Sequence, residues 1–306
     1  MDLCLFLDHH KIDYVLHESV ARLSYVGIGG KAALVIYPKN RGEMLCLLSY
    51  LGANGIPYKV IGNMSNLLPP DEFWNICLVS TKKMRALYYE KESVSAECGV
   101  PLSLLCRSMV LHRLAPMAEL SGIPATVGGS VFQNAGAYGR CIADWLISAD
   151  VYDPRSDRVV RLLRECLGFS YRRSELSSHG ILLSATFSGR EGDPEEAHAA
   201  MQGFLKKRRD SQPSEPSLGS VFLRVGETSA AYYIEQAGLK GYRIGGAAVS
   251  EKHAGFIINA GGATAKDYRA LIELIKQTVA ERFGVSLCTE IEMIEEKGKN
   301  AWLRFA

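Results

Sequence analysis

The pattern of apolar and polar positions along the chain predicts a protein in which helices and short strands alternate. Apolar side chains recur at helical spacing over residues 40–52, 101–111 and 264–284. The first and the third of these segments begin with a capping residue and carry an acidic residue three positions later, which is the capping-box pattern. We expect a further short helix within residues 1–23 and a helical run that continues through Leu205. These segments make up the predicted helical part of the fold.

Short apolar runs bounded by glycine, proline and polar residues predict the strands. The predicted strands are 33–37, 56–61, 76–80, 86–90, 94–100, 146–152, 159–163, 181–187, 254–259 and 287–294. The first two flank the helix at 40–52 and form a βαβ unit with it. We expect the next three to pair as antiparallel strands. The last is expected to carry Glu290 on its solvent face, in alternation with Ile291.

Two stretches of small residues stand out because they are poor in large side chains. One is GNMSN at 62–66, directly after a predicted strand, and the other is ELSGIPATVGGSVFQNAGAYG at 119–139. Glycine lets the backbone approach a ligand closely, and successive N–H groups form concavities that bind anions. We predict that both stretches hold a phosphate-bearing ligand, with a pair of ordinary turns as the alternative. The glycines at 27–30 precede a strand, so they do not form a Rossmann fingerprint.

Composition narrows the class of protein. The chain has 306 residues, enough for two or three domains, and its 35 basic and 33 acidic residues give a net charge of +2. This balance favours neither nucleic acid nor a membrane as a partner, and the basic run at 206–209 is interpreted as a solvated helix end. The eight cysteines form no Cys-x-x-Cys pair and the histidines show no zinc spacing. We therefore expect a cytoplasmic protein without a metal, and no basic secretory segment opens the chain.

Five segments taken together resemble one family, the UDP-N-acetylenolpyruvoylglucosamine reductases (MurB) of peptidoglycan precursor synthesis. In chain order they read GIPATVGGSVFQNAGAYG, FSYRRS, QPSEPSLGSVF, IEQAGLKGYRIGGAAVSEKHAGFIINAGGATAKD and LCTEIEMI. The resemblance covers about residues 20–294. Because the last domain has no extra insertion, the chain is most similar to the shorter, type II branch.

The resemblance implies an α+β protein whose FAD-binding fold is of the vanillyl-alcohol-oxidase (PCMH) type. Two subdomains, expected at residues 1–80 and 81–195, would form the FAD cradle, and a C-terminal α/β domain at 196–306 would bind the substrate. It implies bound FAD, NADPH as hydride donor and UDP-N-acetylglucosamine enolpyruvate as substrate. Hydride would pass through FAD to the enolpyruvyl methylene carbon. We expect the enzyme to be a monomer.

The resemblance also assigns residues to roles. Arg172 would stabilise an enolate-like substrate carboxylate with Glu290 as its partner, and Ser220 would donate the proton. Tyr171, Arg208 and Arg224 are expected to bind substrate, whereas His253 receives no catalytic role. The expected cofactor-binding residues are Gly62, Asn63, Met64, Ser65, Asn66, Ile123, Pro124, Thr126, Val127, Gly128, Gly129, Asn134, Gly136 and Ala137.

Without the family, each catalytic candidate has an ordinary interpretation: a turn serine, a surface arginine and a strand glutamate. The chain also departs from the family pattern at three places. Met64 replaces a glycine, an expected arginine is absent from residues 24–30, and Leu223-Arg224-Val225 follows GSVF where the family ends in proline. Two other functions therefore stay open: another FAD-linked oxidoreductase on the same fold, and a sugar-nucleotide-binding protein without chemistry.

Overall fold

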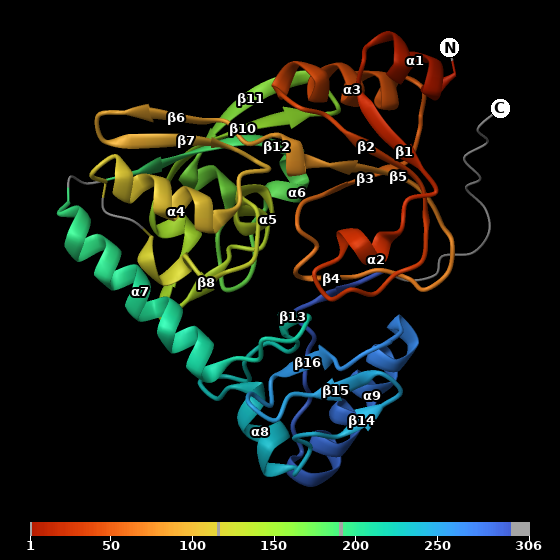
Figure 1. Ribbon diagram of the computed structural model, residues 1–306, viewed down its shortest axis with the longest axis vertical. Coiled ribbons are helices and arrows are strands. Elements are labelled where there is room, and N and C mark those ends of the chain that lie inside the picture. The colour runs from red at the N-terminus through yellow and green to blue at the C-terminus, as the bar shows by residue number, and fades with distance from the viewer. Residues whose placement is uncertain (1, 115–116, 190–191, 295–306) are drawn as a thin grey trace.

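The structure is a computed structural model that describes residues 2–114, 117–189 and 192–294. Figure 1 shows two lobes side by side, each built on a sheet, with a third, smaller lobe beneath them. The long helix α7 (Pro194–Ser211) runs along one side from the second lobe down to the third. The three lobes therefore face a common centre, which is where the candidate site lies.

The first lobe is built on a four-stranded sheet with the order β1-β2-β5-β3. Its strands are β1 (Asp13–Leu16), β2 (Ala32–Tyr37), β5 (Trp74–Ser80) and β3 (Tyr58–Ile61). Its helices are α1 (Leu3–His9), α2 (Val20–Leu23), α3 (Arg41–Ala53) and η1 (Thr81–Lys83). The cap predicted for α3 is confirmed, since the Asn40 side chain accepts from the backbone of Glu43 at 3.0 Å. α3 packs Met44, Leu47, Leu48 and Leu51 into the core.

One expectation for this lobe is wrong and another is incomplete. The segment 76–80 belongs to β5, which is parallel to both β2 and β3 and not antiparallel. A central parallel strand is buried on both faces and has the same continuous apolar run as a short buried antiparallel strand, so sequence does not separate the two. The short helix expected within residues 1–23 is confirmed as α1, but this segment also contains the strand β1 and the helix α2, which were not predicted.

The second lobe has a five-stranded antiparallel sheet with the order β11-β10-β12-β7-β6. These strands are β11 (Arg158–Leu163), β10 (Leu146–Asp153), β12 (Ile181–Ser188), β7 (Ser93–Glu97) and β6 (Leu87–Glu90), close to the predicted runs. The remaining elements are α4 (Leu102–Leu111), η2 (Ala118–Leu120), α5 (Val127–Phe132), β8 (Gly136–Ala137), β9 (Arg140–Cys141), η3 (Ile142–Asp144), η4 (Arg164–Leu167) and α6 (Leu176–His179).

The helix α7 packs against α4 and η2 of the second lobe. The basic residues at 206–209 lie in its last turns, where Lys206 pairs with Asp210 at 2.5 Å. We propose that α7 belongs with the second lobe and that the third domain begins at β13 (Ser217–Ser220).

The third lobe has an antiparallel sheet with the order β13-β16-β15-β14. Its other elements are β16 (Phe256–Asn259), β15 (Ala247–Val249), β14 (Arg243–Ile244), α8 (Ala230–Gln236) and α9 (Ala265–Phe283). The capping box of α9, formed by Thr264 and Asp267, is confirmed, and Gly284 ends the helix in the left-handed conformation. This lobe carries a core of its own beneath β13, β15 and β16.

The prediction of a strand over residues 287–294 is wrong for most of that segment. Only β17 (Glu292–Met293) is a strand, and it pairs in parallel with β4 (Leu67–Leu68) of the first lobe. The chain makes one isolated bridge to the third lobe, between Phe222 and Thr289, and then crosses to the first lobe. Glu290 therefore lies in the crossing between two lobes, which a local alternation pattern does not reveal. Residues 295–306 lie outside the described residues.

The glycines at 27–30 serve the contact between the first and third lobes. Asp71 accepts hydrogen bonds from the backbone of Ala265 at 2.7 Å and of Lys266 at 3.0 Å, at the start of α9. A Cβ at Gly30 would lie 2.3 Å from the carbonyl oxygen of Asp71, so only glycine fits there. Val26 and Ile28 are buried in the core of the third lobe. This segment thus fixes the third lobe against the first.

Asp150 links the first and second lobes, and its removal gives a first testable prediction. Its carboxylate lies 2.7 Å from Arg41 Nη1 and 2.8 Å from Arg161 Nε. Burial acts to raise the pKa of Asp150, but hydrogen bonds from Arg161 and Arg41 outweigh it and lower this pKa below its ordinary 3.8. Because both arginines are partly exposed, we expect Asp150→Asn to lower the free energy of unfolding by about 1 kcal/mol at neutral pH.

A lowered pKa in the folded state stabilises the protein above the unfolded pKa, and this contribution is lost as pH falls through the folded value. The difference between wild type and Asp150→Asn in urea unfolding should therefore shrink at acidic pH. Asp153→Asn is the control, because the contacts of Asp153 with Arg155 and Ser156 lie within one turn of the second lobe and do not join two lobes. A difference that grows on acidification would contradict this assignment.

Candidate active site

A cavity of about 1230 Å³ lies where the three lobes meet. This is larger than the roughly 300–1,000 Å³ of a site for one small ligand, so it has room for two. Eighteen of the residues expected from the sequence line it: Gly62, Asn63, Met64, Ser65, Asn66, Ile123, Pro124, Thr126, Gly128, Gly129, Gly136, Ala137, Tyr171, Arg172, Arg208, Ser220, Arg224 and Glu290. Two other expected residues, Val127 and Asn134, do not line the cavity.

The loop GNMSN follows β3 and presents main chain to the cavity. Within the described residues, no hydrogen bond involves the backbone N–H groups of Asn63, Met64 and Ser65. The side chain of Asn63 donates to the carbonyl of Pro124 at 2.8 Å, which ties this loop to the second glycine-rich stretch. Successive free N–H groups favour an anion. The two loops thus form one wall suited to a phosphate group.

Close packing between the two loops explains why Gly62 has no side chain. A Cβ at Gly62 would lie 2.3 Å from Thr126 Oγ1. Thr126 begins the helix α5, where its Oγ1 accepts from the backbone of Gly129 at 3.3 Å. The stretch at 119–139 is therefore not an open loop throughout, because residues 127–132 form a helix that starts at the cavity wall.

Val127 and Asn134 support the site from behind. Val127 is fully buried in the core of the first two lobes. The Asn134 side chain donates to the carbonyl of Ser170 at 2.8 Å, so it holds the turn that carries Arg172. At Gly136 a Cβ would lie 3.1 Å from Arg172 Nη1, so this glycine leaves room for the guanidinium. These residues of the glycine-rich stretch position Arg172.

Arg172 lies at the tip of a tight turn in which Ser170 and Arg173 exchange backbone hydrogen bonds. Its φ of 55° is in the left-handed region, which a residue with a Cβ seldom adopts and which often marks a functional site. Arg172 Nε lies 2.8 Å from Glu290 Oε1, and the N–H does not point along this line, so the contact is an ion pair without an aligned hydrogen bond. The guanidinium keeps donors free for a ligand.

Glu290 is a largely buried carboxyl group, with 12% of its side chain exposed. Burial raises its pKa, and the adjacent positive charge of Arg172 opposes this without cancelling it. The backbone N–H of Glu290 donates to the carbonyl of Val221 at 2.8 Å, and Asn66 Nδ2 donates to the carbonyl of Glu290 at 3.2 Å. Glu290 is thus held between the GNMSN loop and the residue after Ser220.

Ser220 ends β13 and is half-buried at the cavity. Its Oγ donates to the carbonyl of Phe222 at 3.3 Å, which is a long hydrogen bond for a hydroxyl. The hydroxyl therefore has a weak protein partner and can turn toward a ligand. The three expected catalytic residues come from separate segments of the sequence, and all three line one cavity.

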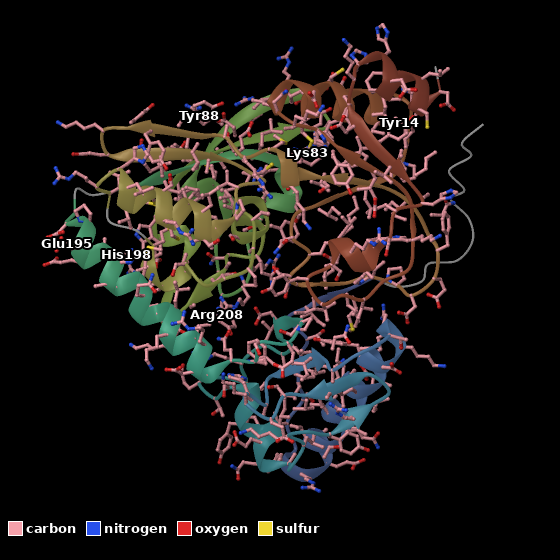
Figure 2. All side chains as sticks on the ribbon, in the orientation of Figure 1. Tyr14, Lys83, Tyr88, Glu195, His198 and Arg208 are labelled. Carbon is pink, nitrogen blue, oxygen red and sulfur yellow. The ribbon has the colours of Figure 1, made fainter. Side chains whose placement is uncertain are left out.

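Arg208, near the end of α7, reaches the cavity where Figure 2 shows this helix approaching the third lobe. It forms no ion pair within the described part of the chain, and its aliphatic stem packs over Gly122. Burial lowers the pKa of Arg208, whereas Tyr138 and Tyr25 act to raise it. Sequence reasoning missed these two tyrosines, although Tyr138 stands in the NAGAYG segment. Arg208, Tyr25 and Tyr138 line the same cavity, where Arg208 supplies a positive charge beside two tyrosines.

His253 also lines the cavity. Its Nδ1 accepts a hydrogen bond from the backbone of Gly255 at 3.1 Å, and its ring packs edge-on against Phe256. Apart from its place in the SEKHAGF segment, no sequence pattern indicated that His253 lies at the cavity.

Met64 takes the left-handed conformation, with φ of 50°, in the loop where the family pattern has glycine. Its side chain is nevertheless buried, in a cluster with Val20, Ile61 and Leu67. A buried methionine contributes about 2–5 kcal/mol, which exceeds the roughly 1–2 kcal/mol of left-handed strain. We therefore expect Met64→Gly to lower the free energy of unfolding by about 2 kcal/mol in denaturant titrations.

Met64→Ala is the matched comparison, because it loses the side chain and keeps the strain. It should be less stable than Met64→Gly. A Met64→Gly variant more stable than wild type would show that strain dominates at this position.

Within the described residues, no three His, Cys, Asp or Glu side chains form a group able to hold a metal ion. Among residues 2–114, 117–189 and 192–294, no helix has both the length and the apolarity needed to cross a bilayer.

Comparison with known proteins assigns the chain to a family. The family model "FAD binding domain" matches residues 32–162, and "UDP-N-acetylenolpyruvoylglucosamine reductase, C-terminal domain" matches residues 212–294. The UDP-N-acetylenolpyruvoylglucosamine reductase of Caldicellulosiruptor bescii is 40% identical over 300 residues, which cover 97% of this chain and 95% of that protein. The corresponding enzyme of Clostridium novyi is 38% identical over 275 residues, 89% of either chain.

The crystal structure of MurB from Thermus caldophilus is similar to this fold, with a TM-score of 0.78 and 31% identity. The alignment covers 92% of this chain and 98% of that one. The expected fold class, an FAD-binding fold of the vanillyl-alcohol-oxidase type followed by a C-terminal domain, is confirmed. The chain belongs to the UDP-N-acetylenolpyruvoylglucosamine reductase (MurB) family.

Proposed function

We propose that this protein reduces UDP-N-acetylglucosamine enolpyruvate to UDP-N-acetylmuramate in peptidoglycan precursor synthesis, with bound FAD and with NADPH as the hydride donor. The observation that carries the proposal is the approach of Arg172, Glu290 and Ser220, from three separate segments, at the cavity of the two glycine-rich loops. We further propose that it acts in the cytoplasm and as a monomer.

The residues of the cavity fit FAD. The free N–H groups of Asn63, Met64 and Ser65 suit the pyrophosphate, and the glycine at 62 lets the two loops pack closely at this wall of the cavity. The cavity of about 1230 Å³ leaves space for a nucleotide substrate beside the cofactor. FAD, when bound, supplies hydride chemistry at the methylene carbon of the enolpyruvyl group.

Arg172 is assigned to the carboxylate of the enolpyruvyl group. Addition of hydride to the methylene carbon places negative charge on the adjoining carbon and carboxylate, as in an enolate. A guanidinium stays charged and offers a planar fork of donors, which suits this carboxylate. Glu290 holds the guanidinium through its Nε, so the Nη groups are left for the substrate.

Ser220 is assigned as the proton donor to the carbon next to the carboxylate. The Oγ–H bond breaks as the new C–H bond forms, and the hydroxyl proton is then restored from solvent. Because its hydrogen bond to the Phe222 carbonyl is long, the hydroxyl can rotate toward the substrate carbon. Tyr171, Arg208 and Arg224 remain our candidates for substrate binding, because all three line the cavity.

The deciding experiment is a set of absorbance spectra. The purified protein should show bound oxidised flavin, anaerobic NADPH should bleach it, and the enolpyruvyl nucleotide should restore it. A colourless protein that also refuses added FAD would overturn the proposal. Oxygen consumption with another substrate and no reaction with NADPH would favour a different FAD-linked oxidoreductase. Binding of the nucleotide without oxidation of the reduced flavin would favour a protein that has lost its chemistry.

A further inference from the structure

The ring of His253 is held rigidly in the turn between β15 and β16. Ser250 Oγ accepts from the backbone of Lys252 at 3.2 Å and of His253 at 3.3 Å. The carbonyl of His253 accepts from Phe256 at 3.0 Å, and the ring itself accepts from Gly255 at 3.1 Å through Nδ1. The side chain is thus fixed by its own turn, and its orientation does not depend on a ligand.

These contacts also fix the position of the ring proton. A nitrogen that accepts a backbone N–H cannot itself carry a hydrogen, so the neutral ring carries its proton on Nε2. Burial lowers the pKa of His253 and Lys240 lowers it further, and these effects outweigh a backbone hydrogen bond within the residue and the charge of Glu235, which act to raise it, so the neutral form is favoured. The ring therefore presents a permanent Nε2–H donor.

This donor has no partner among the residues that the structure describes. Within the described residues no hydrogen bond involves His253 Nε2. The buried side-chain atoms without a partner in the described residues are Ser24 Oγ, Ser80 Oγ, Ser130 Oγ and Arg172 Nε, and His253 Nε2 is not among them. Because His253 lines the cavity, a ligand bound there lies beside this imidazole ring.

His253 belongs to the same wall of the cavity as Ser220. Ser220 pairs with Phe256 across β13 and β16, and the backbone of Val221 donates to the carbonyl of Gly255 at 2.9 Å. Arg224 lies on this wall too, is exposed and forms no ion pair within the described part of the chain. A ligand held against Ser220 therefore meets donors and a cation from the third lobe, which suits an anionic group.

We propose that His253 is a substrate-binding residue whose Nε2–H donates a hydrogen bond to an anionic oxygen of the sugar nucleotide. The inference rests on the proposed function for the identity of that ligand. A base role is ruled out by the same geometry, because Nε2 already carries a proton and Nδ1 is occupied by Gly255.

Two substitutions separate this role from a purely structural one. His253→Asn places an amide oxygen where Nδ1 stands, so it keeps the acceptor for Gly255 and loses the donor. His253→Gln extends an amide N–H to the position of Nε2, so it keeps the donor and loses the bond within the turn. His198→Asn is the control, since His198 lies on the exposed face of α7 (Figure 2) away from the cavity.

The readouts are the dissociation constant for UDP-N-acetylenolpyruvoylglucosamine, measured by calorimetry on the oxidised protein without NADPH, and the melting temperature. We expect His253→Asn to bind about 10- to 100-fold more weakly while melting as wild type does. His253→Gln should bind within about threefold of wild type and melt at a lower temperature. Wild-type binding by His253→Asn, or equal weakening in both variants, would overturn the proposal.

The same titration distinguishes this proposal from the proposed function. A wild-type protein that binds the nucleotide and never reduces it would contradict the proposed function. The comparison of the two variants would still test the role of His253. A wild-type protein that does not bind the nucleotide overturns both. A wild-type protein that binds and reduces it, with unchanged affinity in His253→Asn, overturns the assignment of His253 alone.

Discussion

Replacement of Ser220 by alanine is expected to lower turnover of the enolpyruvyl nucleotide by about 10²- to 10⁴-fold, the usual cost of losing a positioned acid. The substitution removes one oxygen from the end of β13 and leaves the backbone pairing with β16 intact. Within the described residues, the long bond to the Phe222 carbonyl is the only hydrogen bond of this hydroxyl, so we expect the variant to fold as wild type does. The flavin should still be bleached by NADPH at the wild-type rate.

Rapid mixing measures the two half-reactions separately and so locates the defect. Ser211→Ala is the matched control, because Ser211 is an exposed serine whose hydroxyl donates to the carbonyl of Lys207 within α7. It should behave as wild type in both half-reactions. Equal turnover in Ser220→Ala and wild type would remove Ser220 from the mechanism, and slower bleaching by NADPH would mean that the substitution disturbs the cofactor site.

Replacement of Arg172 by lysine is expected to lower turnover by about 10²- to 10³-fold, as for the loss of one donor that stabilises developing charge. Lysine keeps the positive charge but replaces the planar fork by a single ammonium group, which cannot contact Glu290 and the substrate carboxylate together. The loss should appear in kcat more than in KM, because the stabilised charge develops only in the transition state.

The neighbouring arginine provides the control for this second prediction. Arg173 is in the same turn, is exposed and does not line the cavity, so Arg173→Lys should turn over substrate as wild type does. If Arg172→Lys raised KM and left kcat unchanged, Arg172 would contribute to ground-state binding only. If both variants were equally impaired, the effect would come from the turn and not from the guanidinium.

Local signals predicted most of the secondary structure correctly. The caps at Asn40 and Thr264 and the glycine at 284 lie where the sequence placed them, because a helix end is decided by residues within one turn of it. The strands of the second lobe also agree, since antiparallel strands are delimited by turns close by in the sequence. The errors fall where pairing is long-range: β5 is parallel, and the strand expected around Glu290 crosses between lobes.

The candidate site also has a part that the sequence predicted and a part that only the structure shows. The motifs named residues that line the cavity, but no motif indicated that Asn134 holds the turn of Arg172 or that Asn66 holds Glu290. The role proposed for His253 likewise follows from a hydrogen bond to Gly255 and from the cavity, neither of which has a sequence pattern.

By itself, then, the sequence determined the helices, most strands, the two glycine-rich loops and the family, because each depends on residues that are neighbours along the chain. The tertiary structure alone decided that Arg172 meets Glu290 at 2.8 Å beside Ser220, and that Met64 is buried in a left-handed turn. The physical reason is that these contacts join segments far apart in the chain, and only the packing of the three lobes brings them together.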